Sequence, residues 1–391
     1  MRPREIAIGI ALALTGTVVA LGLIEAGIRL YRRAYPPASQ LFLWTRNAEY
    51  GWGLEPGSER VSYDNYGEFR VGVRINSRGL HDVEHETRKE PGTFRILVLG
   101  DSYVEALQVE LEQTFGRLLE RDLRTRLGRP VDVVSAGVSS WGTDNELQYL
   151  RHEGWKYQPD LVLLAFTSTN DVRENYAPYN RLDPWANLSK PSFVLTDAGS
   201  LEMRPGPAIP SIPWWRQLYV WGFVYTRLGG RIVLPKRGQN TVLPPPDPRA
   251  PRVPPDMLVH APEYPPDVAE AWRVTEALIR ALRDETAAHG AKLAVMVHAG
   301  PWVHYLDRWR LMFAGAGAPT ARAWHRRKPL RRIDEFLARE RIDFVDLFPA
   351  FEAAKRNERV FFRINVHWTP AGHRVAAETV TQFLLDRRLV Q

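Results

Sequence analysis

The feature that most restricts the fold of this chain is a regular alternation of two apolar patterns, which begins at Phe94. Short runs rich in β-branched residues, typical of buried strands, occupy residues 94–99, 131–134, 161–166, 292–297 and 343–345. Segments with apolar residues at helical spacing occupy residues 114–127, 143–153, 268–289, 331–341 and 370–385. This alternation predicts a parallel, doubly wound sheet with helices on both faces, which is a three-layer α/β/α sandwich.

A second constraint lies at the N-terminus. Residues 6–24 form a run of nineteen without a charged side chain, and charged residues flank the run on both sides. As a helix the run would be about 28 Å long, close to the thickness of the hydrocarbon core of a membrane. A cleaved signal peptide usually has a shorter apolar region. We therefore expect residues 1–35 to form one uncleaved transmembrane helix, whose orientation the basic residues at both ends do not decide.

The rest of the chain, residues 36–391, is expected to form one domain that contains a long insertion. Between about residues 176 and 266 the alternation stops, and proline, tryptophan and tyrosine become frequent. Proline at this density disfavours helices and favours extended backbone. Because the stretch lies between elements of the sheet, we interpret it as an ordered insertion over the edge where ligands bind, and not as a linker between domains.

Composition excludes several classes of site and partner. The chain has no cysteine, which rules out disulfides, thiolate zinc sites, iron–sulfur clusters and cysteine nucleophiles. Its net charge of +7 is spread along the sequence, without a Lys/Arg-rich block of the kind that binds nucleic acid. We therefore expect no nucleic-acid partner.

Residues that can do chemistry follow the predicted strands, at the edge where open parallel sheets bind ligands. A Gly-Asp-Ser sequence follows the first strand and places Ser102 at the start of a helical turn, with an exposed hydroxyl and a free backbone N–H. Gly137 follows the second strand and allows close approach of the backbone to a ligand. Asn170 follows the third strand, and His367 lies just before a helix expected to start at Pro370.

The four segments around these residues resemble, in order, blocks I, II, III and V of the SGNH (GDSL-like) serine hydrolases. The segments are GDSYVEALQV, SAGVSSWGTDNEL, FTSTNDVREN and NVHWTPAGH. The similarity spans residues 94 to about 387, with the insertion interrupting it. Each block alone is weakly specific, whereas four in order are strongly indicative. The resemblance implies a flavodoxin-like order for the five strands.

The resemblance also implies a role for each of these residues. Ser102 matches the nucleophile, and His367 matches the base that takes its proton. The N–H of Ser102, the N–H of Gly137 and the side-chain amide of Asn170 match the oxyanion hole, which stabilises the negative oxygen of the tetrahedral intermediate. This chemistry needs no metal and no cofactor, so we expect neither.

The chain departs from the family pattern at two positions. Ser168 stands where a glycine usually lies two residues before the block III asparagine. Asn365 stands where an aspartate usually orients the histidine, and its amide oxygen can accept a hydrogen bond but carries no charge. Three interpretations follow: a working Ser-His-Asn triad or Ser-His dyad, rescue by another carboxylate such as Asp343 or Asp346, or a degenerate enzyme. We expect catalysis, because the other residues keep their places.

The expected reaction is acyl-ester chemistry, by an esterase or an O-acyltransferase that acts on an acylated glycan of the cell envelope. The segment HWTPAGH also resembles that of polysaccharide O-acetyltransferases. A single-pass membrane protein with its catalytic domain on the extracytoplasmic, periplasmic side would suit such a substrate. The alternative is a catalytically degenerate protein that holds a glycan or a partner in the same pocket without turnover.

A further motif, residues 81–85, matches the H-x-x-E-H pattern of inverted zinc proteases. It lies in a polar stretch too short for a stable buried helix, so a surface turn is the better interpretation. His373 is expected to cap or pack, since it lies on a different helix face from His367. His298 and His304 are expected at the edge of the core and not as metal ligands.

Overall fold

The structure is a computed structural model of the 391-residue chain. It describes residues 3–34, 44–176, 178, 190–206, 218–220, 253–314 and 322–390. The chain divides into two compact units, of which one comprises residues 1–38 and 208–247 and the other comprises residues 39–207 and 248–391.

A five-stranded parallel sheet forms the centre of the second unit, as the strand–helix alternation predicts. Its strands are β5 (Phe94–Gly100), β6 (Val131–Gly137), β7 (Leu161–Thr167), β10 (Lys292–His298) and β11 (Asp343–Asp346). Their order across the sheet is β11-β10-β7-β5-β6, with every neighbouring pair parallel. This is the flavodoxin-like order, and the chain reverses direction across the sheet between β5 and β7.

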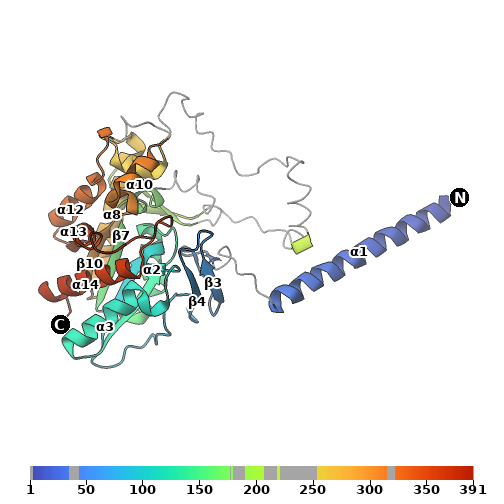
Figure 1. Ribbon diagram of the computed structural model, residues 1–391, viewed down its shortest axis with the longest axis horizontal. Coiled ribbons are helices and arrows are strands. Elements are labelled where there is room, and N and C mark those ends of the chain that lie inside the picture. The colour runs from blue at the N-terminus through green and yellow to red at the C-terminus, as the bar shows by residue number, and fades with distance from the viewer. Residues whose placement is uncertain are drawn as a thin grey trace. The chain divides into compact units, whose positions relative to one another are not determined.

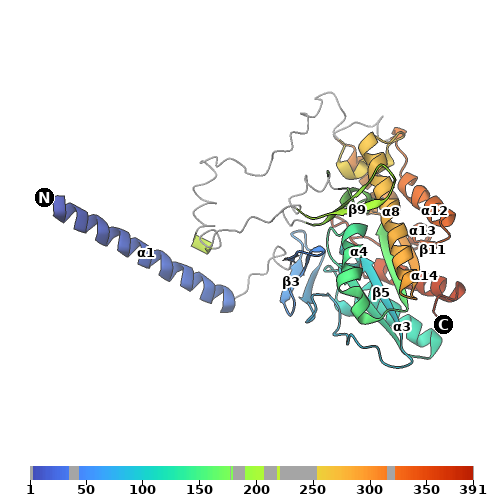
Figure 2. The ribbon, with the colours of Figure 1, turned by 180° about the vertical axis from the view of Figure 1, so that it is seen from behind.

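Helices cover both faces of this sheet, and the two faces have separate apolar cores (Figures 1 and 2). On one face pack α3 (Phe115–Leu127), α13 (Phe348–Ala354) and α14 (Pro370–Asp386). On the other face pack α4 (Thr143–His152), α8 (Pro266–Ala288) and α12 (Lys328–Arg339). In β5, Ile96 and Val98 belong to the first core and Leu97 and Leu99 to the second, because successive side chains of a strand point to opposite faces.

Short elements at the carboxyl edge and around the sheet complete the second unit. The antiparallel pairs are β1 (Trp44–Asn47) with β2 (Gly51–Leu54), β3 (Glu59–Tyr63) with β4 (Arg70–Arg74), and β8 (Ser192–Leu195) with β9 (Leu201–Arg204). The short helices are α2 (Ser102–Glu105), η1 (Leu111–Gln113), η2 (Gly154–Tyr157), α5 (Asp171–Glu174), η5 (Pro255–His260), α9 (Pro301–His304) and α10 (Leu306–Met312).

The expected insertion at about 176–266 is only partly described. The pair β8–β9 and the helix η5 lie within it, and most of its remaining residues lie outside the described part of the chain. Phe193 of β8 is buried in the core beside α8, so this part of the insertion packs on the sheet's helical layer.

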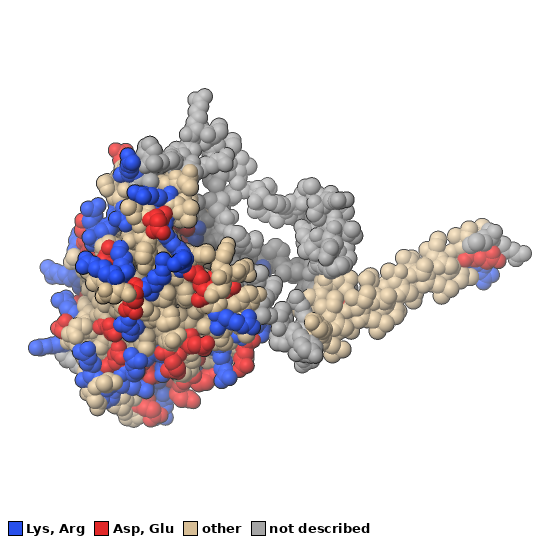
Figure 3. Space-filling view, viewed as in Figure 1, with Lys and Arg blue, Asp and Glu red and all other residues tan. Residues whose placement is uncertain are grey.

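The first unit contains the helix α1 (Pro3–Ala34). Residues 3–31 of this helix are long and apolar enough to cross a membrane, a property that signal sequences near an N-terminus share. Its apolar side chains are exposed, and Figure 3 shows an uncharged surface along most of its length. The predicted apolar N-terminal helix is therefore present.

Candidate active site

Ser102 lies at the carboxyl end of β5, as the first residue of α2. The turn before it needs a glycine at position 100, where a Cβ would come within 2.4 Å of Val104 Cγ2. Asp101 caps the helix, since its Oδ1 accepts from the backbone N–H of Tyr103 at 2.9 Å. As the first residue of the helix, Ser102 has an N–H with no intrahelical acceptor. This N–H is available to an anion at the site.

His367 and Asn365 form the second part of the site. Asn365 Oδ1 accepts from the backbone N–H of His367 at 3.0 Å, which fixes the orientation of the amide. The same oxygen lies 2.6 Å from His367 Nδ1, so Nδ1 must carry the hydrogen. Nε2 of the ring is then left with a free lone pair, which is the tautomer that a general base needs.

Burial lowers the pKa of His367 to about 4. An aspartate beside the ring would raise this pKa by favouring the charged imidazolium, but the uncharged amide of Asn365 cannot. The histidine is therefore neutral and able to accept a proton at neutral pH. The contact with Asn365 orients the His367 ring as an aspartate would, but it supplies no negative charge.

The loop that carries these two residues is held by Glu68, from the turn between β3 and β4. The carboxylate of Glu68 accepts from the backbone N–H groups of Ile364 and Asn365, both at 2.8 Å, and from that of Arg363. Three consecutive N–H groups converge on one carboxylate, which is the arrangement of an anion-binding nest. Glu68 thus fixes the backbone immediately before His367.

Two further side chains attach the same loop to the rest of the site. The hydroxyl of Tyr103, the neighbour of Ser102, donates to the carbonyl of Val366 at 2.9 Å. The Tyr103 ring also lies 5.2 Å from the ring of His367. Arg308 of α10 donates to the carbonyls of Phe362, at 3.2 Å, and of Arg363. Tyr103 therefore connects the element that carries Ser102 to the loop that carries His367.

Asn170 is the cap residue before α5, at the end of β7. Its Nδ2 donates to Asp101 Oδ2 at 2.9 Å and to Glu174 Oε2 at 3.2 Å. Asp101 Oδ2 also accepts from Thr167 Oγ1 at 2.9 Å, so one carboxyl group connects the ends of β5 and β7. To bind an oxyanion, the Asn170 amide would exchange one of its two carboxyl partners for the substrate oxygen.

The carboxyl groups beside Asn170 are buried, and burial raises their pKa values. Burial raises the pKa of Asp101, and it raises that of Glu174 to about 8. Burial, together with mutual repulsion, raises the pKa values of Glu146 and Asp171 well above their usual range. A carboxyl group that holds a proton at neutral pH, as Glu174 does with a pKa of about 8, does not repel a developing oxyanion.

Gly137 ends β6, opposite Gly100 of β5. A Cβ at Gly137 would lie 2.5 Å from Val104 Cβ and 2.6 Å from the backbone nitrogen of Glu105, so the packing of α2 requires a glycine. The N–H of Val138 donates to Gly100 O at 3.2 Å, and strand alternation directs the N–H of Gly137 to the other side of β6. Its place in the oxyanion hole stays a prediction, because packing already explains the glycine.

A cavity of about 350 Å³ brings Ser102 and Asn170 together, while His367 and Gly137 are not among its lining residues. Ser102, Tyr103 and Asn170 line it, as does Val366, the residue before His367. Its remaining walls come from residues Thr169, Asp256, Trp302, Arg308, Leu311 and Met312. The volume is at the small end of the range for ligand pockets. The structure thus gathers elements from β5, β7, α10 and the loop before α14 around one small space.

Of these residues, Glu68, Tyr103 and Arg308 were missed by the sequence analysis. The position of Tyr103 in the sequence could have indicated that it belongs to the site, because it directly follows the expected nucleophile. Glu68 and Arg308 had no such signal, because Glu68 lies 297 residues before Asn365 and Arg308 lies 54 residues before Phe362.

The replacement carboxylates considered for the histidine have other partners. Asp343 accepts from Arg387 Nε at 2.8 Å, and Asp346 accepts from the backbone N–H of Phe348 at 2.8 Å. Both lie in β11 and stabilise the surroundings of that strand. Asp343 and Asp346 therefore have structural contacts, as expected for residues of this strand.

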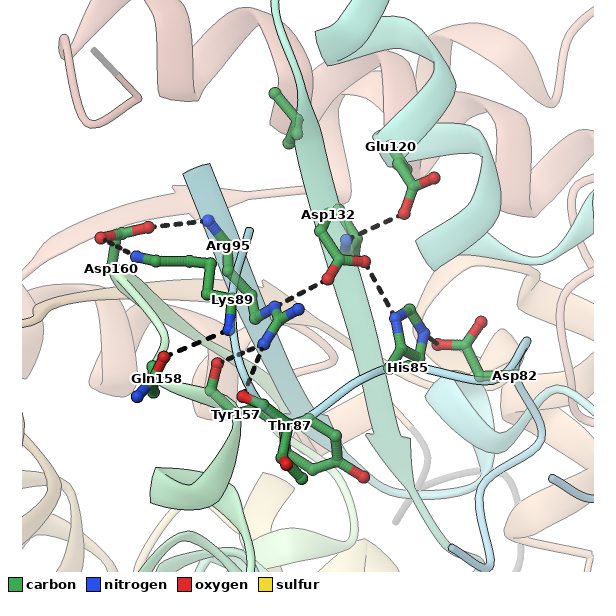
Figure 4. A network of polar contacts seen from close by, with 12 residues as sticks. Asp82, His85, Thr87, Lys89, Arg95, Glu120, Asp132, Tyr157, Gln158 and Asp160 are labelled. Carbon is green, nitrogen blue, oxygen red and sulfur yellow. Dashed lines mark hydrogen bonds and ion pairs between the residues drawn. The ribbon is translucent and has the colours of Figure 1, made fainter. Parts of the chain in front are cut away.

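The interpretation of residues 81–85 as a surface turn is wrong, because His81, Asp82 and His85 are buried. His85 lies between Asp82, at 3.0 Å, and Asp132, at 2.9 Å, and these hydrogen bonds outweigh burial and raise its pKa to about 9 (Figure 4). Asp82 also accepts from the backbone N–H of Ser135 at 2.8 Å, at the free edge of β6. The segment covers the edge strand through polar contacts that its composition does not reveal.

The other histidines have structural partners, as expected. Nδ1 of His373 accepts from the backbone N–H of Phe115 at 3.1 Å, at the start of α3. His298 lies 3.0 Å from Thr167 Oγ1, and His304 lies 3.0 Å from Glu352 Oε1.

Comparison with solved structures finds GDSL-type enzymes. A putative lipolytic protein of the G-D-S-L family from Desulfitobacterium hafniense DCB-2 is 8% identical, with 74% of this chain and 99% of that chain covered and a TM-score of 0.37. The acetylxylan esterase Axe2 from Geobacillus stearothermophilus is 14% identical, with 74% and 94% covered and a TM-score of 0.39. A GDSL-like lipase from Bacteroides thetaiotaomicron VPI-5482 is 12% identical, with 75% and 88% covered and a TM-score of 0.35.

Comparison with curated proteins finds no match. Residues 260–391 match the model of a family described as "SGNH hydrolase-like domain, acetyltransferase AlgX". This stretch contains β10, β11, α14 and the loop that carries Asn365 and His367. The expected resemblance is thereby confirmed over residues 260–391, which contain the block around His367, and this part of the chain is similar to the SGNH hydrolase-like domain of the AlgX acetyltransferase family.

Proposed function

We propose that this protein is an SGNH-type acyl-ester enzyme in which Ser102 is the nucleophile and His367 is the general base. The observation that carries the proposal is the tautomer of His367. Asn365 holds the hydrogen on Nδ1, and the loop containing both residues borders the cavity that Ser102 lines. Acyl transfer through a serine ester requires an uncharged, oriented imidazole that takes the proton of the serine, and we propose that His367 does this for Ser102.

In the proposed reaction, Nε2 of His367 takes the proton of the Ser102 hydroxyl as Oγ attacks the ester carbonyl carbon. The Ser102 N–H and the Asn170 amide donate to the oxygen that becomes negative, and Gly137 is the predicted third donor. When the intermediate collapses, the ester C–O bond breaks and the leaving alcohol receives the proton from His367. Water or a sugar hydroxyl then attacks the acyl-enzyme by the same sequence, which releases an acid or a new ester.

The substrate that we propose is an O-acylated glycan with a short acyl group, such as acetyl. The small cavity beside Ser102 and the acetyltransferase family matched by residues 260–391 both support a short acyl group. We further propose that α1 is an uncleaved anchor and that the catalytic domain is extracytoplasmic, where envelope glycans are found. Hydrolysis and transfer share every step up to the acyl-enzyme, so the acceptor decides between them.

The test is labelling of the full chain, purified in detergent, by a fluorophosphonate probe that reacts with activated serines. We expect labelling of the wild type and its loss in both Ser102→Ala and His367→Ala. Ser168→Ala is a matched control, because Ser168 is buried at the end of β7 and has no part in the mechanism. Labelling that persists in Ser102→Ala would place the reactive serine elsewhere.

The second candidate function is binding of a glycan or a partner without turnover. It is favoured by the uncharged Asn365 and by the two carboxyl groups that occupy the Asn170 amide. A folded wild-type protein that resists the probe would contradict the catalytic proposal and support this alternative.

A further inference from the structure

The exposed hydrophobic side chains of the second unit are unevenly distributed. Among its described residues, six large hydrophobic side chains are exposed: Tyr66, Met203, Leu306, Leu311, Ile364 and Val366. Four of the six, called the apolar rim here, lie on α10 or in the loop before His367: Leu306, Leu311, Ile364 and Val366. Single exposed hydrophobic residues are ordinary, whereas a group of them marks a surface that contacts something other than water.

The two segments that carry the apolar rim lie side by side at the cavity of the candidate active site. Arg308 of α10 donates to the carbonyl of Phe362 at 3.2 Å, and to that of Arg363. Leu311 from the helix and Val366 from the loop both line the cavity. The exposed hydrophobic side chains therefore gather around its opening.

The helix α10 is apolar on its exposed face as well as on its buried face. Trp309 is buried, whereas Leu306 and Leu311 are 47% and 71% exposed. Leu306, Arg310 and Leu311 share one face, because residues four and five positions apart lie on the same side of a helix. A helix that is apolar all round is normally covered on every side. The exposed face of α10 thus lacks a contact that the described part of this unit does not supply.

The cavity does not account for the whole of the apolar rim. Leu306 and Ile364 are exposed but are not among the residues that line the Ser102 cavity. All four side chains of the rim are aliphatic, and aliphatic side chains gain free energy when they leave water for hydrocarbon. A polar sugar chain offers little hydrocarbon, so a lipid matches this surface better than a glycan does.

The chain itself indicates which apolar phase is within reach. The helix α1 is long and apolar enough to cross a membrane, and residues 35–43 separate its end from the start of β1. A stretch of that length spans at most roughly 35 Å. If α1 is the proposed anchor, the same short connection keeps the second unit near the bilayer surface.

Exposed arginines border the apolar rim. Arg310 lies on the same face of α10 as the two leucines, and Arg363 directly precedes Ile364. Asp307 is an acidic residue on that face. A neighbouring cavity, which Leu306 also lines, adds three further exposed arginines: Arg322, Arg327 and Arg331. In Figure 3, Lys and Arg side chains are frequent over the part of the surface formed by α10 and α12. Aliphatic side chains flanked by arginines are typical of surfaces that bind anionic lipids.

We propose that the apolar rim docks on the surface of an anionic lipid bilayer, with its aliphatic side chains among the lipid chains and the arginines at the phosphate groups. Docking holds the opening of the Ser102 cavity against the membrane. The contact itself does not depend on catalysis. If the proposed function at Ser102 is correct, the ester that reacts is one held at the membrane surface.

The experiment measures quenching of a fluorescent dye by a nitroxide-labelled lipid. The chain has no cysteine, so a single introduced cysteine carries the dye NBD at one known position. Leu311→Cys and Ile364→Cys place the dye on the apolar rim. Thr125→Cys is the matched control, because Thr125 is exposed near the end of α3. That end leads into the start of β6 and therefore lies at the opposite edge of the sheet from Ser102.

Each labelled full chain is reconstituted into phosphatidylcholine vesicles that contain phosphatidylglycerol and the nitroxide-labelled lipid. We expect the nitroxide to quench the dye on the rim at least about twofold more than the dye at position 125. Replacing phosphatidylglycerol by phosphatidylcholine should reduce this quenching, because the arginines lose their anionic partners. Adding Ser102→Ala should leave the quenching unchanged, which separates docking from catalysis.

The variant Leu306→Glu/Leu311→Glu, made in the Ile364→Cys chain, places two charges on the rim. Both leucines are exposed, so the substitutions leave the core intact. We expect quenching to fall by at least about twofold, since carboxylates disfavour contact with lipid chains. Met203→Glu is the matched control, because Met203 is a hydrophobic residue that is 49% exposed and lies outside the rim. It should leave the quenching unchanged.

Three results would overturn the proposal. Equal quenching at positions 125, 311 and 364 would show that the rim has no preferential contact with lipid. Unchanged quenching in Leu306→Glu/Leu311→Glu would place the contact elsewhere. Energy transfer between labelled copies in the vesicles, without quenching by the nitroxide-labelled lipid, would identify a second copy of the chain as the occupant of the rim.

Discussion

At the scale of single residues, the site separates two functions that an aspartate usually performs together. Asn365 orients His367 and selects its tautomer through two hydrogen bonds to one oxygen. It supplies no negative charge, and burial therefore lowers the pKa of the histidine to about 4. His367, the proposed base, is therefore neutral over almost the whole physiological pH range, but it is also weakly basic.

This separation predicts the effect of Asn365→Asp. Activity requires neutral His367, so in the wild type the rate should fall only as the pH drops through about 4. A carboxylate beside Nδ1 favours the imidazolium and raises the histidine pKa by about 1–3 units. We expect the acid limb of the pH dependence of kcat/KM for p-nitrophenyl acetate to move to higher pH by that amount.

The control for this prediction is Asn357→Asp, the same change at an exposed position outside the site. It should leave the acid limb in place. An acid limb that stays unmoved in Asn365→Asp would show that His367 is not the group whose protonation limits the rate.

At the scale of elements, the β3–β4 hairpin supports the loop that carries Asn365 and His367. Its turn carries Glu68, which binds three consecutive backbone N–H groups before His367. Phe69 of the same turn contacts the ring of Phe362 at the start of that loop, with 5.3 Å between ring centroids. The β3–β4 hairpin precedes all five strands of the central sheet in the sequence. It nevertheless positions His367, which follows all five strands.

We predict that Glu68→Gln lowers turnover more than stability. The substitution removes the negative charge and one acceptor oxygen, and hydrogen bonds to a charged group contribute roughly 1.5–3 kcal/mol each. Small displacements of a catalytic group reduce rates strongly, so we expect kcat to fall by roughly 10–100-fold with little change in KM. The measurement is steady-state hydrolysis of p-nitrophenyl acetate beside the melting temperature.

Glu59→Gln provides the matched control in the same hairpin, because Glu59 pairs with Arg74 on the exposed side. It should leave kcat unchanged. If Glu68→Gln lowered the melting temperature and left kcat intact, its carboxylate would be a structural contact and not a positioning one.

At the scale of the whole molecule, the features that could be predicted from sequence are those with a local pattern. The five strands, the helices between them and the apolar helix α1 all have such patterns, and the flavodoxin-like strand order came with the family resemblance. No local sequence pattern indicates the burial of His85 or the contact of Glu68 with the loop at residues 363–365. Both depend on polar contacts between distant segments, which hydrophobic periodicity does not encode.

The last prediction concerns α1, whose apolar span could be an anchor or a cleaved signal sequence. We expect the full chain to stay in the membrane fraction after an alkaline carbonate wash, and its intact mass to include residues 1–35. A variant that lacks residues 1–35 should no longer be found in the membrane fraction after the wash, because no other described helix is long and apolar enough to span a membrane. Leu12→Arg/Leu14→Arg should also weaken retention, since each arginine in the bilayer centre costs about 2.5–3.5 kcal/mol on insertion scales. Recovery of a shortened, soluble protein would identify a signal sequence and contradict the proposal that α1 is an uncleaved anchor.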